Sequence, residues 1–167
     1  MTQILTEPTL RAAPDDPISG RMVFVGCSRR KTATTEPIPA LELYQGGAIP
    51  ALRARIGQRP GLRARVRILS ARHGLLHPDT ALLPYDQPLT DALTDKLRPR
   101  VWAQLLTELH THGVPRRVLV ITEPPYLSLI DDLFQLPGLR PALVWVPDHR
   151  MWPHAEAVLD GWGWPRP

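Results

Sequence analysis

The chain has 167 residues, a formal net charge of +4, 20 prolines and one cysteine. Its length fits a single domain with a sizeable core, and an apolar share of 43% is ordinary for a soluble globular protein. No apolar run approaches the ~20 residues of a membrane helix, which argues against a membrane-spanning protein. One cysteine excludes an internal disulfide, and residues 1–20 lack the apolar stretch of a secretory signal, so we expect a cytoplasmic protein.

The charge is unevenly distributed along the chain. The segment Arg29–Arg72 holds ten basic and two acidic residues, so the remainder of the chain is net acidic. A concentrated basic segment favours an anionic partner, either a small anionic molecule or a nucleic acid. The alternative is a solvated arginine-rich face without any partner.

Apolar runs and turn residues predict the strands in chain order. Residues 1–20 contain prolines and little periodicity, which predicts a disordered or loosely packed tail before a single domain over 21–167. Four strands are expected at Arg21–Val25, Val66–Leu69, Arg117–Ile121 and Ala142–Val146.

Helices are expected between these strands. The first spans Ala40–Ile56 and is broken near Gly46 and Gly47, with Pro50 in the first turn of its second piece. The second is a long helix with leucines every four residues; it is capped by Thr90, kinked or restarted at Pro99, and ended by Gly113. A short helix is expected at Leu127–Leu136 and a last one within Trp152–Trp164. Strands that alternate with helices predict parallel β-α units. The expected fold is therefore a single three-layer α/β/α domain with a mainly parallel sheet of about four strands.

Chemically useful residues follow the predicted strands. In open α/β sheets, ligands bind outside the carboxyl ends of the strands, where neighbouring strand ends share one crevice. The residues that fall at these ends or in the loop after the second strand are Cys27, Ser28, Arg30, Lys31, Ser70, Arg72, His73, Asp79, Tyr85, Asp86, Glu123, Tyr126, Asp148 and His149. We therefore expect the first two strand ends to lie side by side and to form a site.

Each of the main candidates has a possible role and a purely structural alternative. Cys27 is a candidate nucleophile, with cations nearby to stabilise its thiolate, or else a small residue buried at a strand end. His73 and Asp86 are candidates for proton transfer, or else parts of turns. Tyr85 is suited to stack on a base and hold it, or else belongs with Asp86 to a plain turn between Pro84 and Pro88.

The remaining candidates would bind the substrate. Ser28 and Ser70 can hydrogen-bond a phosphate or a base, or instead cap their turns. Arg30, Lys31 and Arg72 would bind an anionic group, and Glu123 would contact the substrate; Lys31 and Arg72 could equally form structural ion pairs.

Standard motifs are absent from the sequence. There is no phosphate-binding loop, no dinucleotide fingerprint and no serine-hydrolase elbow. A single cysteine and the lack of an H-E-x-x-H pattern argue against zinc, so no metal and no cofactor are expected.

Four short blocks of the sequence resemble a known family. They are Gly26–Lys31, Pro39–Tyr44, Ile68–Leu76 and Pro84–Asp86, and together they resemble DUF6884, a group of small bacterial and phage domains of undefined role. The segment Cys27–Lys31 is also similar to one in domains of archaeal tRNA-guanine transglycosylase relatives, which act on 7-deazaguanine bases in RNA. This second resemblance implies a layered α/β fold and a substrate with a nucleobase.

The combined expectation is an enzyme that acts on a nucleobase, a nucleotide or a base in nucleic acid, by base modification or glycosidic-bond chemistry. A noncatalytic nucleic-acid-binding module and a redox or stress protein that uses Cys27 are the alternatives. An enzyme requires a pocket that gathers Cys27, Ser70, His73 and Asp86. A binding module requires an exposed basic stripe over Arg53–Arg67, and a redox protein requires an exposed, reactive Cys27.

Overall fold

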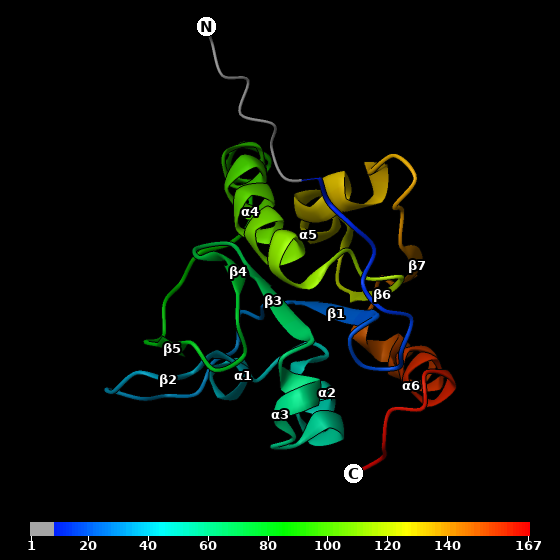
Figure 1. Ribbon diagram of the computed structural model, residues 1–167. Helices are drawn as coiled ribbons and strands as arrows, with labels where there is room; N and C mark the ends of the chain where they lie inside the picture. The colour runs from blue at the N-terminus through cyan, green and yellow to red at the C-terminus, as the bar shows by residue number, and fades with distance from the viewer. Residues whose placement is uncertain (1–8) are drawn as a thin grey trace, which may run out of the picture.

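The computed structural model describes residues 9–167, and a five-stranded sheet lies at its centre (Figure 1). The strands, in their order across the sheet, are β4 (Gly74–Leu76), β3 (Val66–Ser70), β1 (Arg21–Gly26), β6 (Arg117–Ile121) and β7 (Ala142–Val146). The last four are parallel, and β4 runs antiparallel to β3. The four predicted strands and the mainly parallel sheet are confirmed.

Helices cover both faces of the sheet and make three layers (Figure 1). One face carries α4 (Asp91–His112), α5 (Pro124–Leu127) and the 3-10 helix η1 (Ser128–Gln135). The other carries α1 (Ala40–Leu43), α2 (Ile49–Ile56), α3 (Pro60–Arg63) and α6 (Trp152–Gly161), which follows the 3-10 helix η2 (His149–Met151). Within residues 9–167, no helix is both long enough and apolar enough to cross a membrane.

Local sequence signals explain the ends of these helices. The Thr90 side chain accepts a hydrogen bond from the amide of Leu93 and caps α4, and Pro50 lies in the first turn of α2. Gly113, with a φ of 84°, ends α4 in a conformation that favours glycine. Pro99 lies inside α4, which continues through it as one helix.

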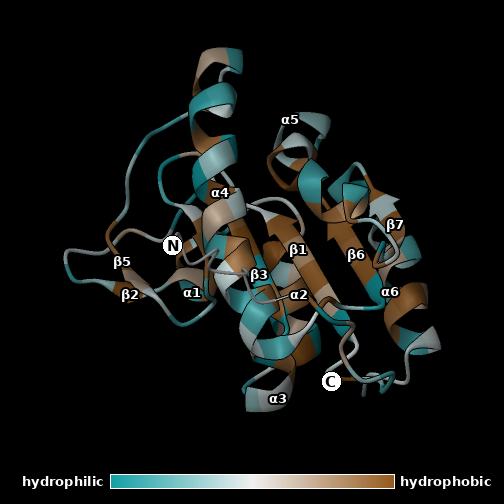
Figure 2. Cartoon of the chain, turned by 45° about the horizontal axis from the view of Figure 1, so that its top comes forward, coloured by the Kyte–Doolittle hydropathy of each residue, from teal (hydrophilic) through white to brown (hydrophobic). Residues whose placement is uncertain are grey.

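Two apolar cores lie on either side of the sheet because side chains alternate along each strand (Figure 2). Met22 and Phe24 of β1 belong to the core under α4, whereas Val23 and Val25 belong to the core under α2 and α6. All four side chains are buried. Strands buried on both faces read as continuous apolar runs, which is why they were predictable from sequence.

The block Ser70–Gly74 is the turn of a hairpin between β3 and β4. Ser70 pairs with Gly74, and the Ser70 Oγ accepts hydrogen bonds from the amides of Arg72 and His73. Gly74 has a φ of 73°, and a Cβ there would lie 2.7 Å from Gln104 Oε1, so the turn requires glycine. The sequence of this block indicates only the end of a strand, so β4 was not predicted.

Two further features were not predicted. A small antiparallel pair forms between β2 (Ile38–Pro39) and β5 (Ala81–Leu82), so the loop after β4 folds back beside α1. Residues 11–20 are hydrogen-bonded to the rest of the domain: Ala13 is buried and its amide donates to the carbonyl of Val114, whose own amide donates to the carbonyl of Arg11. The first eight residues of the expected tail lie outside the described residues.

Candidate functional site

Two adjoining hollows lie at the carboxyl ends of β1 and β6. The smaller, here called the inner cavity, has a volume of about 270 Å³ and is lined by Cys27, Ser28, Arg29, Lys31, Tyr85, Asp86, Gln87, Pro88 and Tyr126. The larger, here called the outer depression, has a volume of about 760 Å³ and extends over the ends of β6 and β7. As expected, the ends of β1 and β3 are neighbours: the amide of Cys27 donates to the carbonyl of Leu69 at 2.8 Å.

The loop after β1 is held by the segment between α1 and α2. Lys31 pairs with Tyr44 as an isolated bridge, and the amide of Gln45 donates to the carbonyl of Arg30. The Ser28 hydroxyl donates to the carbonyl of Arg30 and accepts from the amide of Gly46. Ser28 therefore fixes the shape of the loop, and that shape directs Cys27 and Lys31 into the inner cavity.

Cys27 is half-buried and shares the inner cavity with Tyr126, which comes from α5. Its thiol donates a hydrogen bond to the Tyr126 hydroxyl over 3.3 Å. Burial, and then the neighbouring Cys27, raise the pKa of Tyr126, so the phenol stays protonated at neutral pH. A neutral phenol beside the sulfur can donate a hydrogen bond to a developing thiolate or to a bound ligand.

Lys31 lies above the ring of Tyr85, with its ammonium nitrogen 4.5 Å from the ring centroid. It donates to the carbonyl of Arg29 and makes no ion pair within the described part of the chain. Burial lowers the pKa of Lys31, while Cys27 and Asp86 act in the opposite direction. A larger share of this amine is therefore neutral than at an exposed lysine, which favours its use as a base or nucleophile.

Three hydroxyl groups meet beneath Lys31. The Tyr85 hydroxyl hydrogen-bonds the hydroxyls of both Tyr44 and Ser70, the latter over 2.6 Å. Tyr44 and Ser70 are fully buried, and burial raises the pKa of both tyrosines. The network fixes the ring of Tyr85, and Lys31 covers that ring. Tyr85 therefore positions Lys31, a role different from the base stacking expected from sequence.

The residues after β3 lie beside this network, and neither hollow is lined by Ser70, Arg72 or His73. His73 is half-buried and packs edge-on against Tyr85, with 5.1 Å between the ring centroids. Burial, then Arg72 and Arg100, lower the pKa of His73, so its ring is neutral at neutral pH. Of the four residues expected in one pocket, Cys27 and Asp86 line the inner cavity, whereas Ser70 and His73 do not.

The other predicted candidates divide between the two hollows. Asp86 is exposed and lines the inner cavity, while Arg30, Glu123 and His149 line the outer depression. Asp148, also in the outer depression, forms an ion pair with Arg150. Among residues 9–167, no cluster of three or more histidine, cysteine, aspartate or glutamate side chains could hold a metal ion.

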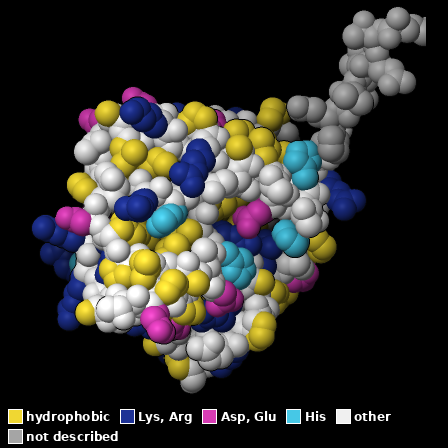
Figure 3. All heavy atoms as spheres, turned by 90° about the vertical axis from the view of Figure 1, so that its left-hand side faces the viewer, with side chains coloured by type: hydrophobic (Ala, Val, Ile, Leu, Met, Phe, Trp, Pro, Cys, Tyr) yellow, Lys and Arg dark blue, Asp and Glu magenta, His cyan; other side chains and the backbone are white. Residues whose placement is uncertain are grey.

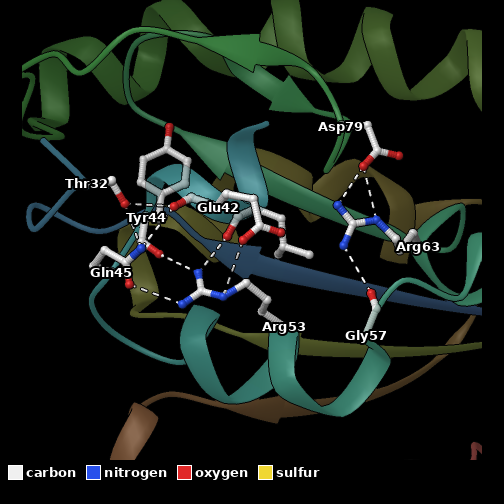
Figure 4. A network of polar contacts seen from close by, with 9 residues as sticks. Thr32, Glu42, Tyr44, Gln45, Arg53, Gly57, Arg63 and Asp79 are labelled. Carbon is white, nitrogen blue, oxygen red and sulfur yellow. Dashed lines mark hydrogen bonds and ion pairs between the residues drawn. The ribbon is translucent and has the colours of Figure 1, made fainter. Parts of the chain in front are cut away.

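The exposed basic stripe that a noncatalytic binding module requires over Arg53–Arg67 is not present in the structure. Arg55, Arg63, Arg65 and Arg67 are buried, and they donate to backbone carbonyls or pair with carboxylates. Figure 4 shows Arg63 between Asp79 and the carbonyl of Gly57, which makes Asp79 a structural residue. On the face drawn in Figure 3, basic side chains stand in separate groups among apolar and uncharged ones.

Arg53 illustrates what these arginines do. Its guanidinium donates to the carbonyls of Leu41 and Tyr44 and to the side chain of Gln45, and it lies 3.8 Å from a carboxylate oxygen of Glu42 (Figure 4). These contacts join α2 to the end of α1. Arg53 thus supports the segment that holds the loop after β1.

Tyr44 and Gln87 were not identified as site residues from the sequence, and Tyr126 was noted only as a residue near a strand end. Tyr44 lies within the block Pro39–Tyr44 that resembles the family, which was the one available signal. Its contact with Tyr85 spans 41 residues of sequence and depends on the fold-back of the loop before Tyr85.

The fold and the site define a three-layer α/β protein whose ligand-sized cavity lies at the carboxyl ends of its central parallel strands. More particularly, the chain belongs to DUF6884, a family of unknown function, whose pattern matches residues 22–136. The match covers every residue that lines the inner cavity and ends before β7. No curated protein and no solved structure shows a significant match to this chain.

Proposed function

We propose that this protein is an enzyme that acts on a nucleobase, either free, in a nucleotide or in nucleic acid, by base modification or glycosidic-bond chemistry. The observation that carries the proposal is the composition of the inner cavity, where a thiol, an amine and a carboxylate, from Cys27, Lys31 and Asp86, share about 270 Å³. That volume lies at the small end of the ~300–1,000 Å³ of typical ligand sites, as suits a single base.

The roles follow from the chemistry of each group. Cys27 is the candidate nucleophile, and Lys31, whose pKa is lowered by burial, is the group in the cavity best placed to take a proton from it or from a ring nitrogen. Asp86 at the rim can accept hydrogen bonds from the edge of a base or activate a water molecule. Because His73 does not line the cavity, Lys31 replaces it as the preferred proton acceptor.

The two alternative functions receive less support. A noncatalytic binding module was expected to use the arginines over 53–67, and these are mostly buried and engaged within the protein. A thiol-based redox protein commonly pairs its reactive cysteine with a second one, and the chain has a single cysteine.

The single thiol provides a direct test of occupancy. Iodoacetamide modification of Cys27 is followed by mass spectrometry with and without a panel of bases, nucleosides and nucleotides. A ligand in the inner cavity should slow the modification at least about tenfold, since it covers the sulfur. Compounds that protect Cys27 are then incubated with the protein and analysed for conversion.

Two variants sharpen this test, because the chain contains only two lysines. The substitution Lys31→Met should abolish both protection and conversion. Lys96→Met removes the same charge from the exposed surface of α4 and should leave both unchanged. The proposal is wrong if no member of the panel slows the modification of Cys27.

A further inference from the structure

The outer depression is continuous with the inner cavity. The two hollows share five lining residues, which are Cys27, Ser28, Arg29, Pro88 and Tyr126. A ligand whose base fills the inner cavity would therefore extend past Arg29 into the outer depression. With about 760 Å³, the depression holds far more than one phosphate or one ribose.

The outer depression also contains two free cations of the basic segment; a third arginine that is free within the described part of the chain, Arg72, lies outside it, near the ring of Tyr85. The guanidinium groups of Arg29 and Arg30 have no hydrogen-bond or ion-pair partner among residues 9–167, whereas six arginines from Arg53 to Arg67 are engaged within the protein. Asp148 and Arg150 pair with each other across 2.6 Å, which leaves Glu123 as the one acidic group opposite these two cations.

Apolar surfaces lie between these charges. Pro88, Leu89, Pro125 and Pro147 line the depression together with the ring of Tyr126. Cations beside apolar and aromatic surfaces are the combination that binds single-stranded nucleic acid, where phosphates contact the cations and unpaired bases pack against the uncharged walls. A base in a duplex could not enter a cavity of about 270 Å³ without leaving its stack.

From this geometry we propose that the substrate base belongs to a single-stranded nucleic acid, whose backbone crosses the outer depression past Arg29 and Arg30. The inference rests on the proposed function for the inner cavity and names its substrate class. A mononucleotide would fill the inner cavity but would leave most of the outer depression unused. Affinity should therefore depend on strand length and on the two free arginines of the depression.

The experiment measures fluorescence anisotropy with labelled single-stranded DNA and RNA of about eight nucleotides, a site size typical of single-strand binders. A matched duplex and unlabelled mononucleotides serve as competitors. We expect the single strand to bind at least about tenfold more tightly than a mononucleotide. Binding should weaken with salt, because each phosphate contact releases counterions.

A double variant tests the arginines directly. Arg29→Gln with Arg30→Gln should weaken single-strand binding at low salt at least about tenfold and make the slope of log K against log salt shallower by about 1.4. The matched control is Arg117→Gln with Arg140→Gln, which removes the same charge from exposed positions at the opposite end of β6 and β7. Its binding should equal that of the unaltered protein.

Three results would overturn the inference: equal affinity for mononucleotide and strand, preference for the duplex, or an equal loss in the control variant. Failure of the proposed function is separate and shows in the modification of Cys27. If mononucleotides protect Cys27 but strands bind no better, the inner site stands and the extension fails. If strands bind without protecting Cys27, the outer contacts are real but the proposed function fails.

Discussion

Tyr85 connects the candidate site to the core through one hydroxyl group. That hydroxyl contacts Tyr44 and Ser70, both fully buried, and its ring supports Lys31 on the cavity side and His73 at its edge. A buried hydroxyl that loses its partner costs more than the bond itself was worth, because it cannot return to water.

We therefore predict that Tyr85→Phe lowers the free energy of unfolding by about 1–3 kcal/mol. Tyr126→Phe is the matched control: it removes an identical hydroxyl whose one partner is the Cys27 thiol, a weak donor, and should cost about 0.5 kcal/mol or less. Urea unfolding of the two variants measures the difference. Equal losses of unfolding free energy in the two variants would mean that the hydroxyl network of Tyr85 does not contribute to stability beyond what the Tyr126 hydroxyl contributes.

The contacts of individual side chains were the least predictable feature from the sequence. An aromatic residue such as Tyr85 suggested stacking on a base. Nothing in the neighbouring sequence indicates that Lys31 covers the ring of Tyr85, or that the Tyr85 hydroxyl contacts Tyr44, which is 41 residues away in the sequence. Cys27 and Lys31 line the inner cavity because the end of β1 fixes where the loop directly after it lies. Side-chain orientation, in contrast, depends on contacts between distant segments.

Strands of five or six residues were predictable from the sequence, and strands of two or three residues were not. β1, β3 and β6 are buried on both faces and β7 lies at the edge of the sheet, and each is mainly apolar, although β3 also holds the buried Arg67. β4 has three residues, and β2 and β5 have two each, which is too short for any periodicity. These short strands exist because the turn at Ser70–Gly74 and the loop after it fold back onto α1 and β3.

The end of β1 needs glycine for a reason of packing rather than conformation. A Cβ on Gly26 would lie 2.2 Å from Oγ1 and 3.1 Å from Cβ of Thr122, the residue that follows β6. The two strand ends that frame the outer depression are therefore in direct contact. A larger residue must push them apart.

We predict that Gly26→Ala destabilises the protein by about 1–3 kcal/mol, the usual cost of overpacking, and alters the rate of Cys27 modification. Gly61→Ala is the control, because a Cβ there meets nothing within 4 Å and its position lies in α3. It should be neutral or stabilise by about 0.4–1 kcal/mol. Thermal unfolding of both variants checks the pair, and a neutral Gly26→Ala would show that Thr122 moves aside freely.

At the scale of the whole molecule, each arginine from Arg53 to Arg67 donates to at least one backbone carbonyl within the protein. The net charge of a segment does not reveal whether its charged side chains face solvent or the protein interior. A guanidinium has five N–H donors, which can reach several carbonyls at once. Arg65 donates to the carbonyl of Arg21, and Arg67 pairs with Glu108 on α4 at 2.7 Å. The many arginines of this segment therefore reflect contacts that join elements of the fold more than contacts with a partner.

Arg55 connects α2 to α6 and to the C-terminal residues that follow α6. Its side chain is 1% exposed, and it donates to Asp160 at 2.8 Å and to the carbonyls of Trp164 and Pro165. Together with Arg59, which donates to the carbonyls of Pro165 and Arg166, Arg55 holds the C-terminal residues against α2. This contact lies partly outside residues 22–136, so it attaches the segment beyond the family match to the segment within it.

Replacing Arg55 with methionine keeps most of the side-chain volume but removes every donor, and it leaves the Trp164 carbonyl buried without this partner. We predict a loss of about 2–3 kcal/mol in unfolding free energy, less than for a fully buried ion pair because Asp160 is 35% exposed and retains Arg166. Arg59→Met is the matched control, since Arg59 reaches the same C-terminal carbonyls from an exposed position and should cost about 0.5 kcal/mol. Guanidinium unfolding of the two variants decides the matter: equal losses, or a more stable Arg55→Met protein, would show that apolar packing alone holds the C-terminal segment in place.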